Sequence, residues 1–149
     1  CRWGALWLAK LLIEKGANIN ALDSEGYTPL YFAYQNRYLD MVKFLIQKGA
    51  NIMDRNGLTF LHLACSRQES LSLVKFLIEN GVDINKIYGH VQTPLHLACK
   101  NDNLEIVKFL IEQGAKINKI EGSDQTPLLV ACKKGHFEIV KFLIKNGAS

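Results

Sequence analysis

A five-residue string that returns at a fixed interval constrains the fold of this chain more than any other feature. Val-Lys-Phe-Leu-Ile occurs four times, and residues 9–13 form a fifth, degenerate copy. The interval between copies is about 33 residues, and a glycine follows each copy. A threonine opens each of the later units, at Thr28, Thr59, Thr93 and Thr126. Because three independent columns share one period, the sequence predicts a stack of repeated structural units.

Each unit is expected to form two short helices and an extended loop. At Thr93-Pro94, the Thr oxygen can accept a hydrogen bond from an unpaired N–H, and Pro at the first helical position loses none. The second helix carries apolar residues such as Leu104 and Leu110 on one face, and Gly114 ends it because glycine tolerates a left-handed turn. Two helices this short cannot bury both apolar faces alone. The predicted fold class is therefore all-α, a solenoid of stacked helix–loop–helix units.

Three segments carry a resemblance to a known family. They are Gly16-Ala17-Asn18-Ile19-Asn20, Thr93-Pro94-Leu95-His96-Leu97-Ala98 and Gly135-His136-Phe137-Glu138-Ile139-Val140. On these motifs the whole chain resembles the ankyrin-repeat family. The resemblance implies stacked helix pairs with short β-hairpin fingers. It also implies that fingertips and inner helices together form a concave face that binds partners.

We expect one domain over residues 1–149. Its parts are a partial repeat at 1–22, repeats at 23–53, 54–87 and 88–120, and a truncated last repeat at 121–149. Cys1-Arg2-Trp3-Gly4 falls in register with Cys132-Lys133-Lys134-Gly135, which places the first residues inside a first helix. Neither end shows the polar, atypical repeat that caps a solenoid, so we expect the chain to be part of a longer array. The apolar runs are too short for a membrane span.

The resemblance implies a non-catalytic, monomeric protein–protein interaction module, a scaffold or adaptor, that binds a protein partner through the concave face. The alternative is a regulatory or targeting segment of a larger enzyme, channel or secreted effector. The candidate contact residues lie on fingers and at exposed ends of inner helices. They are Tyr27, Leu58, Tyr88, His90, Gln92, Gln125, Arg67, Lys100, Lys133 and Lys134. Phosphate-loop, His-Glu-x-x-His and Gly-x-Ser-x-Gly motifs are absent from the sequence, and we expect no catalytic residue, metal or cofactor.

Two His-x-x-Cys pairs, His62/Cys65 and His96/Cys99, suggest a metal site. Equivalent side chains of adjacent repeats should lie about 8–10 Å apart, which is too far to share one zinc ion. Cys65, Cys99 and Cys132 form one column, spaced beyond disulfide reach, and are expected to pack in the core. The histidines resemble the family's helix-start histidine, which hydrogen-bonds near the threonine. Few, reduced cysteines favour an intracellular setting, cytoplasmic or nuclear.

The formal net charge of +4 raises the hypothesis of nucleic-acid binding. Lysines form a column on the outer helices, at Lys10, Lys43, Lys75, Lys108 and Lys141. Acidic residues three or four positions away make this a mixed, solvated face, and we expect no aromatic residue to interleave with it. On the inner face, Lys100, Lys133 and Lys134 favour an acidic or phosphorylated protein segment as partner. The alternative is that Lys is simply a common surface residue of this chain.

The repeats differ from one another at a few positions. The finger before Thr59 lacks two residues, which predicts a tip retracted by about 3–4 Å, or else neutral loop variation. Arg37 and Asp102 stand where Gly135 occurs, at a position suited to left-handed backbone. Finger asparagines follow a leucine by eight residues, at Asn20, Asn85 and Asn118. They resemble sites hydroxylated in some animal ankyrin proteins, and the alternative is that each one ties the finger backbone.

Overall fold

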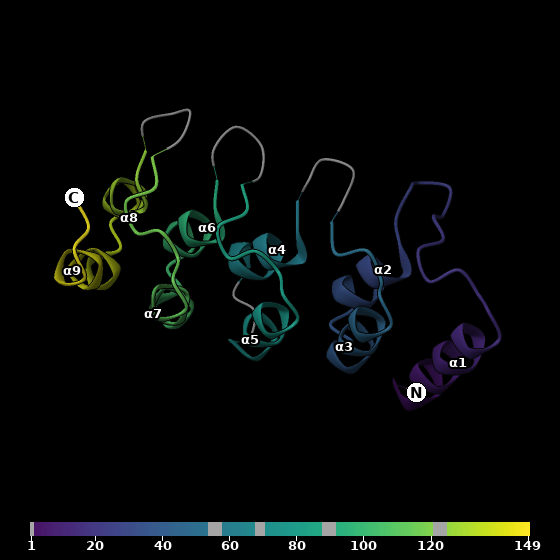
Figure 1. Ribbon diagram of the computed structural model, residues 1–149. Helices are drawn as coiled ribbons and strands as arrows, with labels where there is room; N and C mark the ends of the chain where they lie inside the picture. Colours follow the sequence, from purple (N-terminus) through teal and green to yellow (C-terminus); the bar gives the residue numbers. More distant parts are fainter. Residues whose placement is uncertain (1, 54–57, 68–70, 88–91, 121–124) are drawn as a thin grey trace. The chain divides into compact units, whose positions relative to one another are not determined.

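The computed structural model of the chain divides into two compact units. They are Cys1–Ile52 and Met53–Ser149. The structure describes residues 2–53, 58–67, 71–87, 92–120 and 125–149, without the side chains of residues 2–5 (Figure 1). The expectation that all 149 residues form one domain, with the repeat boundaries given above, stays a prediction.

The first unit contains one long helix and one helix pair. These are α1 (Arg2–Glu14), α2 (Pro29–Gln35) and α3 (Leu39–Gln47). Helices α2 and α3 pack against each other and bury Leu30 and Val42 completely. On α3 the buried residues recur at the helical spacing of three and four, from Met41 to Ile46. The repeat string therefore lies in the second helix of a pair and supplies most of the residues that this helix buries.

The second unit is built of three helix pairs in two layers. The pairs are α4 (Phe60–Ser66) with α5 (Leu71–Glu79), α6 (Pro94–Lys100) with α7 (Leu104–Glu112), and α8 (Pro127–Lys134) with α9 (Phe137–Lys145). The inner helices α4, α6 and α8 pack side by side, and the outer helices α5, α7 and α9 do the same (Figure 1). Leu77, Leu110 and Leu143 are fully buried between the layers. This arrangement confirms the predicted all-α, stacked helix–loop–helix fold.

The predicted helix starts are confirmed in both units. The Oγ1 atoms of Thr28, Thr59, Thr93 and Thr126 each accept a hydrogen bond from the backbone N–H three residues on. Proline follows the threonine in α2, α6 and α8, and α4 begins with Phe60 instead. The helix forms in either case, because the threonine side chain supplies the missing acceptor and proline only pre-sets the backbone angle.

Arg37, Asp102 and Gly135 adopt the left-handed backbone predicted for the turn between paired helices. Their φ angles are +57°, +56° and +75°. Glycine meets this angle without strain, whereas a side chain such as that of Arg37 is disfavoured there. The turn geometry is therefore imposed by the packing of the helix pair, and two of these three positions hold it without glycine.

Two details of the backbone differ from the sequence-based expectation. Gly4 does not interrupt the first helix, although it falls in register with Gly135: α1 runs unbroken from Arg2 to Glu14. A glycine inside a helix costs only about 1 kcal/mol relative to alanine, so Gly4 need not end the helix. The described parts of the fingers contain turns and isolated bridge residues, among them the antiparallel bridge between Met53 and Thr59, and no strand ladder. The predicted retraction of the fingertip before Thr59 falls on residues 54–57, outside the described ranges.

The helices of the described ranges are all short or interrupted by polar residues. None of them is long and apolar enough to cross a membrane. Trp7 of α1 is 65% exposed.

Candidate functional site

Buried histidines hold the fingers of the second unit onto the inner helices. In α4, the Nδ1 atom of His62 accepts hydrogen bonds from the Thr59 N–H (3.3 Å) and the Thr59 hydroxyl (2.8 Å). Since Nδ1 is an acceptor, Nε2 carries the proton. The Nε2–H group donates hydrogen bonds to the carbonyl oxygens of Lys86 (2.9 Å) and Gln92 (3.1 Å). One imidazole therefore forms hydrogen bonds with the backbone on both sides of the next finger. Burial is the main cause that lowers the pKa of His62.

His96 of α6 makes the same connection one repeat later. Its Nδ1 accepts from the N–H and hydroxyl of Thr93, and its Nε2 donates to the carbonyl oxygen of Gln125 at 3.0 Å. The predicted hydrogen bond near the threonine is confirmed. The link to the next finger was not predicted, because it joins residues that are distant in the sequence.

The side chains of the finger asparagines accept hydrogen bonds from the loop of the following repeat. In the first unit, Asn20 Oδ1 accepts from the Asn51 N–H at 2.7 Å. In the second unit, Asn85 and Asn118 accept from the N–H groups of Lys116 and Ser149 at 2.9 and 3.0 Å. These contacts confirm the structural role considered for the asparagines. The finger bases are thus fixed by side chains of the preceding repeat.

The basic candidates of the second unit lie at matching ends of adjacent inner helices. Arg67 follows the last residue of α4, Lys100 ends α6, and Lys133 and Lys134 end α8. All four side chains are exposed. Cations at helix C-termini also interact favourably with the helix dipole, so these positions suit the helices as well as a ligand. We call these four residues the basic face.

His136 connects two members of the basic face. Its Nε2 donates to the carbonyl oxygen of Lys100 at 3.1 Å, and its Nδ1 lies 3.5 Å from a carboxylate oxygen of Asp102. Because His136 follows Lys134 by two residues, this bond brings the end of α6 against the turn that follows α8. His136 was not predicted as a site residue; the available signal was its place directly after Gly135, at a turn whose left-handed backbone recurs at Arg37 and Asp102.

The finger candidates are less exposed than the basic ones. Tyr27 is 38% exposed, while Leu58, Gln92 and Gln125 are half-buried at the finger bases. The backbones of Gln92 and Gln125 are held by His62 and His96, as described above. Tyr88 and His90 lie outside the described residues.

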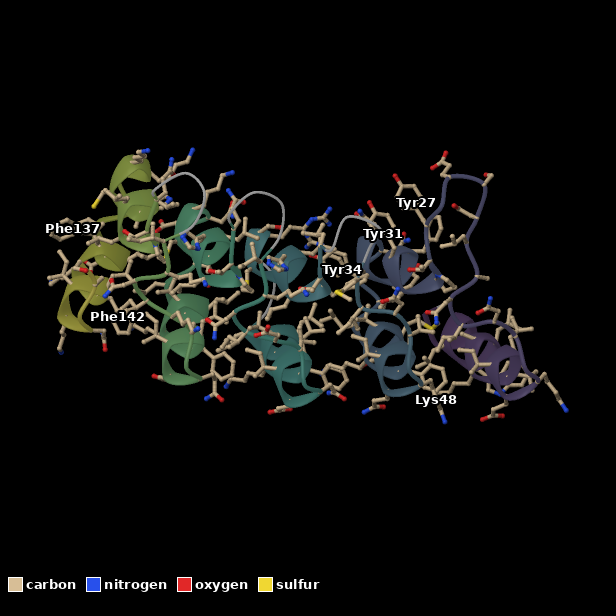
Figure 2. The ribbon with its side chains drawn as sticks, turned by 45° about the horizontal axis from the view of Figure 1, so that its top comes forward. Tyr27, Tyr31, Tyr34, Lys48, Phe137 and Phe142 are labelled. Carbon is tan, nitrogen blue, oxygen red and sulfur yellow. The ribbon has the colours of Figure 1, made fainter. Side chains whose placement is uncertain are left out.

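Aromatic side chains gather around Tyr27 in the first unit (Figure 2). The rings of Tyr27 and Tyr31 are stacked, with centroids 4.4 Å apart and planes within 11°. Phe32, 45% exposed, meets both rings edge to face. Tyr31 and Phe32 were not predicted as site residues, although the spacing of four residues between Tyr27 and Tyr31 was the available signal.

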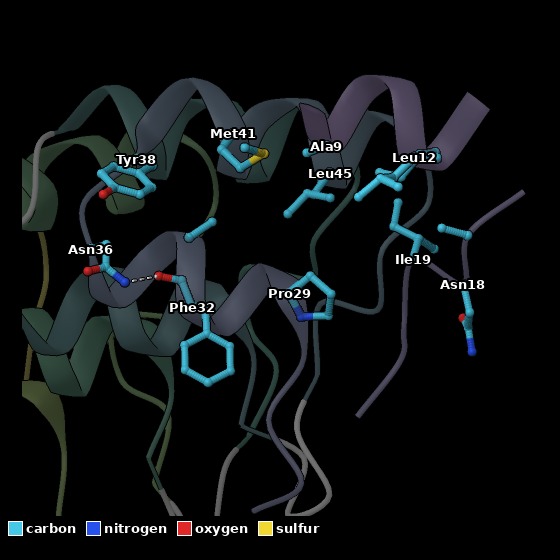
Figure 3. A pocket seen from close by; sticks show the side chains of 13 residues that line it. Ala9, Leu12, Asn18, Ile19, Pro29, Phe32, Asn36, Tyr38, Met41 and Leu45 are labelled. Atoms are coloured by element: carbon cyan, nitrogen blue, oxygen red, sulfur yellow. Dashed lines mark hydrogen bonds between the residues drawn. The ribbon is translucent and has the colours of Figure 1, made fainter. Parts of the chain in front are cut away.

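The first unit also contains an apolar pocket of about 330 Å³ (Figure 3). It lies among α1, the following loop, α2 and α3, and its lining includes Leu12, Ile19, Phe32 and Met41. The polar groups of Asn18, Asn36 and Tyr38 also line it. This pocket was not predicted from the sequence.

The cysteine column is only partly buried. Cys65 and Cys99 are fully buried, and burial raises the pKa of both thiols, that of Cys99 to about 12. Cys132 is exposed, so its predicted place in the core is wrong. The reason is that α6 covers α4 and α8 covers α6, while in the described structure no further inner helix covers α8. The three thiols are free.

The lysine column on the outer helices is accompanied by aromatic rings. The ammonium groups of Lys75 and Lys108 lie over the rings of Phe109 and Phe142 in the next repeat, at 5.5 and 5.8 Å from the centroids. Lys10 lies over Phe44 in the same way in the first unit. The expectation that no aromatic residue interleaves with these lysines is therefore wrong. Since each lysine covers the ring of the following repeat, these phenylalanine faces are used within the fold.

Comparisons with known proteins agree with the repeat architecture. A family model described as "Ankyrin repeats (3 copies)" matches residues 1–88 and 61–149. The mouse "Ankyrin repeat, SAM and basic leucine zipper domain-containing protein 1" is 32% identical over 66% of this chain and 22% of its own length. The mouse "B-cell lymphoma 3 protein homolog" is 40% identical over 59% of this chain and 20% of its own length. The human "Palmitoyltransferase ZDHHC13" is 36% identical over 65% of this chain and 16% of its own length. The chain thus spans about a fifth of the length of the curated relatives it matches.

Proposed function

Because this chain belongs to the ankyrin-repeat family, we propose that it is a non-catalytic module that binds a protein partner through its fingers and inner helices. Ankyrin repeats are generally protein–protein interaction modules. The partner that the chemistry favours at the second unit is an acidic or phosphorylated segment. Such a segment carries the carboxylate or phosphate oxygens that Lys and Arg side chains recognise.

One observation carries this proposal: the exposed ends of three adjacent inner helices all hold basic side chains. The hydrogen bond from His136 to the Lys100 carbonyl brings the α6 end against the turn that follows Lys133 and Lys134. An extended segment that crosses α4, α6 and α8 would meet Arg67 and then these lysines in turn. Asp102, 59% exposed, is an acidic side chain near this path, since its carboxylate lies 3.5 Å from His136 Nδ1.

Free, buried thiols such as Cys65 and Cys99 support placing this module in a reducing, intracellular compartment, cytoplasmic or nuclear. A second candidate function is a regulatory or targeting segment of a larger protein. It is favoured by the small share of each relative that the chain covers, the palmitoyltransferase included. In that case partner binding by the basic face would change the activity or the position of the attached protein. The measurement that favours this candidate is an activity of a longer polypeptide that responds to substitutions in the basic face.

The experiment that tests the proposal selects partners from a random peptide library with the 149-residue chain as bait. We expect one family of acidic sequences, and about tenfold or greater weakening of the best peptide by Lys100→Glu, Lys133→Glu and Lys134→Glu combined. The matched control reverses three exposed lysines elsewhere, at Lys116, Lys141 and Lys145, and so has the same net charge.

Equal weakening in both triple variants would show a general charge effect and refute the basic face as the site. The absence of any enriched sequence family would contradict the module function itself. A duplex DNA fragment serves as a second polyanion. Binding to DNA as tight as to the peptide, with a steep fall of affinity in salt, would favour a nucleic-acid partner instead.

A further inference from the structure

Three aromatic side chains of the first unit contact one another and form a rigid surface. We define the aromatic surface as Tyr27, Tyr31 and Phe32. The ring centroids of Tyr27 and Tyr31, which are labelled in Figure 2, lie 4.4 Å apart with nearly parallel planes. The Phe32 ring meets Tyr27 edge to face, with centroids 6.1 Å apart. Tyr27 and Phe32 are 38% and 45% exposed, so large apolar areas remain in contact with water. Exposed, preformed aromatic groups are typical anchors of binding surfaces.

Hydrogen bonds hold both stacked residues in place. The carboxylate of Asp23 accepts from the Tyr27 N–H at 2.8 Å, and the Asp23 N–H donates to the Tyr27 carbonyl at 3.1 Å. The Tyr31 N–H is capped by Thr28 Oγ1 at 3.2 Å, and the Tyr31 hydroxyl accepts from Gln35 Nε2 at 2.6 Å. Little ordering is therefore needed when a ligand binds to these rings.

The stacked pair is a local departure from the repeat and is not needed for the fold. The equivalent pairs in the second unit are Leu58 with His62, Gln92 with His96, and Gln125 with Leu129. None of these pairs contains two aromatic rings. At the inner-helix position, His62 and His96 use their rings to hold the next finger. In the first unit the same two positions instead hold two stacked tyrosines, of which Tyr27 is 38% exposed.

The charge around the aromatic surface is negative, in contrast to the chain as a whole. Residues 16–36 contain no Lys or Arg, and this is the longest such stretch of a chain with a net charge of +4. Within it, Asp23 and Glu25 of the finger are exposed acidic residues, and Asp23 is bonded directly to Tyr27. A ring face with carboxylates beside it attracts a cation and repels an anion.

We propose that the aromatic surface binds an arginine side chain of a partner protein, with the guanidinium on the exposed face of Tyr27 and near the finger carboxylates. Arginine fits better than lysine, because its planar guanidinium both stacks on an aromatic face and pairs with a carboxylate. Arginine is thus the chemical group recognised at Tyr27, and this assignment rests on the proposed function of the fingers and inner helices. It differs in charge from the basic face of the second unit, so the two sites select different parts of a partner.

The test is an NMR titration of the full 149-residue chain with acetyl-Gly-Arg-Gly-amide. The neutral comparison peptide replaces Arg by citrulline, which has the same shape without the charge. We expect the arginine peptide to shift the amide signals of Tyr27 and Tyr31, with a dissociation constant in the millimolar range. The citrulline peptide should bind at least about threefold more weakly.

Substitutions test separately whether the ring of Tyr27, the charge of the finger carboxylates and the fold of the chain are needed for binding. Tyr27→Leu should abolish the shifts at Tyr31, whereas Tyr27→Phe should retain them because the ring face remains. Asp23→Asn with Glu25→Gln keeps the hydrogen-bonding shape of the finger and should weaken binding of the arginine peptide without loss of helix signal. Phe137→Leu is the matched control, since Phe137 is another exposed aromatic residue, in the second unit, and should change nothing.

Equal binding of the citrulline peptide would overturn the proposal, because the surface would then be a general apolar patch. Binding that persists in Tyr27→Leu, or shifts confined to other parts of the chain, would do the same, and so would no binding at all. The peptide titration needs no natural partner, so its failure leaves the library selection intact. A positive titration with an empty library selection would instead reject the proposed function of the basic face.

Discussion

Replacement of His96 by Leu tests how much the histidine link between repeats contributes to stability. His96 is 2% exposed, and leucine is close to it in size, so the main change is the loss of hydrogen bonds. Those are the bond from Nε2 to the Gln125 carbonyl and the two bonds that Nδ1 accepts from Thr93. Each of these hydrogen bonds contributes about 1 kcal/mol, and the substitution leaves a buried donor unpaired. We therefore expect a loss of about 2–4 kcal/mol in the free energy of unfolding.

The control for this substitution is provided by the chain itself. Leu129 occupies the equivalent position of α8, is 45% exposed, and its N–H is still capped by Thr126 at 3.3 Å. Leucine at this position is thus compatible with the helix and its cap. Leu129→His should therefore change stability by less than about 0.5 kcal/mol, since the side chain at this position is 45% exposed.

The assay is urea denaturation followed by far-UV circular dichroism, with hydrogen exchange of the Thr93 amide as a local readout. His96→Leu should lower the midpoint and expose the Thr93 amide to exchange. A loss below about 0.5 kcal/mol, or an equal loss in the Leu129→His control, would refute the reasoning that the histidine link stabilises the stack.

Three further predictions follow from single residues. Arg37→Gly should stabilise the first unit by about 0.5–1 kcal/mol in thermal denaturation, because the φ of +57° suits glycine better than arginine; destabilisation would contradict this. The pKa of His62 is lowered in the fold, so the unfolded chain binds more protons. Stability measured by denaturation should therefore be constant above pH of about 6.5 and fall as the pH decreases below it, less so in His62→Leu. Iodoacetamide at neutral pH should label Cys132 in the folded chain and spare Cys65 and Cys99, as mass spectrometry of the peptides would show.

The sequence by itself determined the repeat and its internal signals. The threonine caps and the glycine stops are local, since each depends on residues within about one helical turn, and the 33-residue period is read directly from their recurrence. For this reason the helix pairs and the left-handed turns at Arg37 and Asp102 could be predicted, and the family resemblance added the hydrogen bonds of His62 and His96 to the threonines. The basic residues at the helix ends could be assigned to exposed positions on the same grounds.

Only the tertiary structure decided which side chains meet across repeats. The bonds from His96 to Gln125 and from His136 to Lys100 join residues about one repeat apart, and no local pattern specifies such pairs. Cys132 differs from Cys65 and Cys99 for the same reason, because its exposure depends on whether a neighbouring helix covers it and not on its place in the repeat. The stacking of Tyr27 on Tyr31 also depends on how the finger folds back over its helix, through the backbone bonds that Asp23 makes.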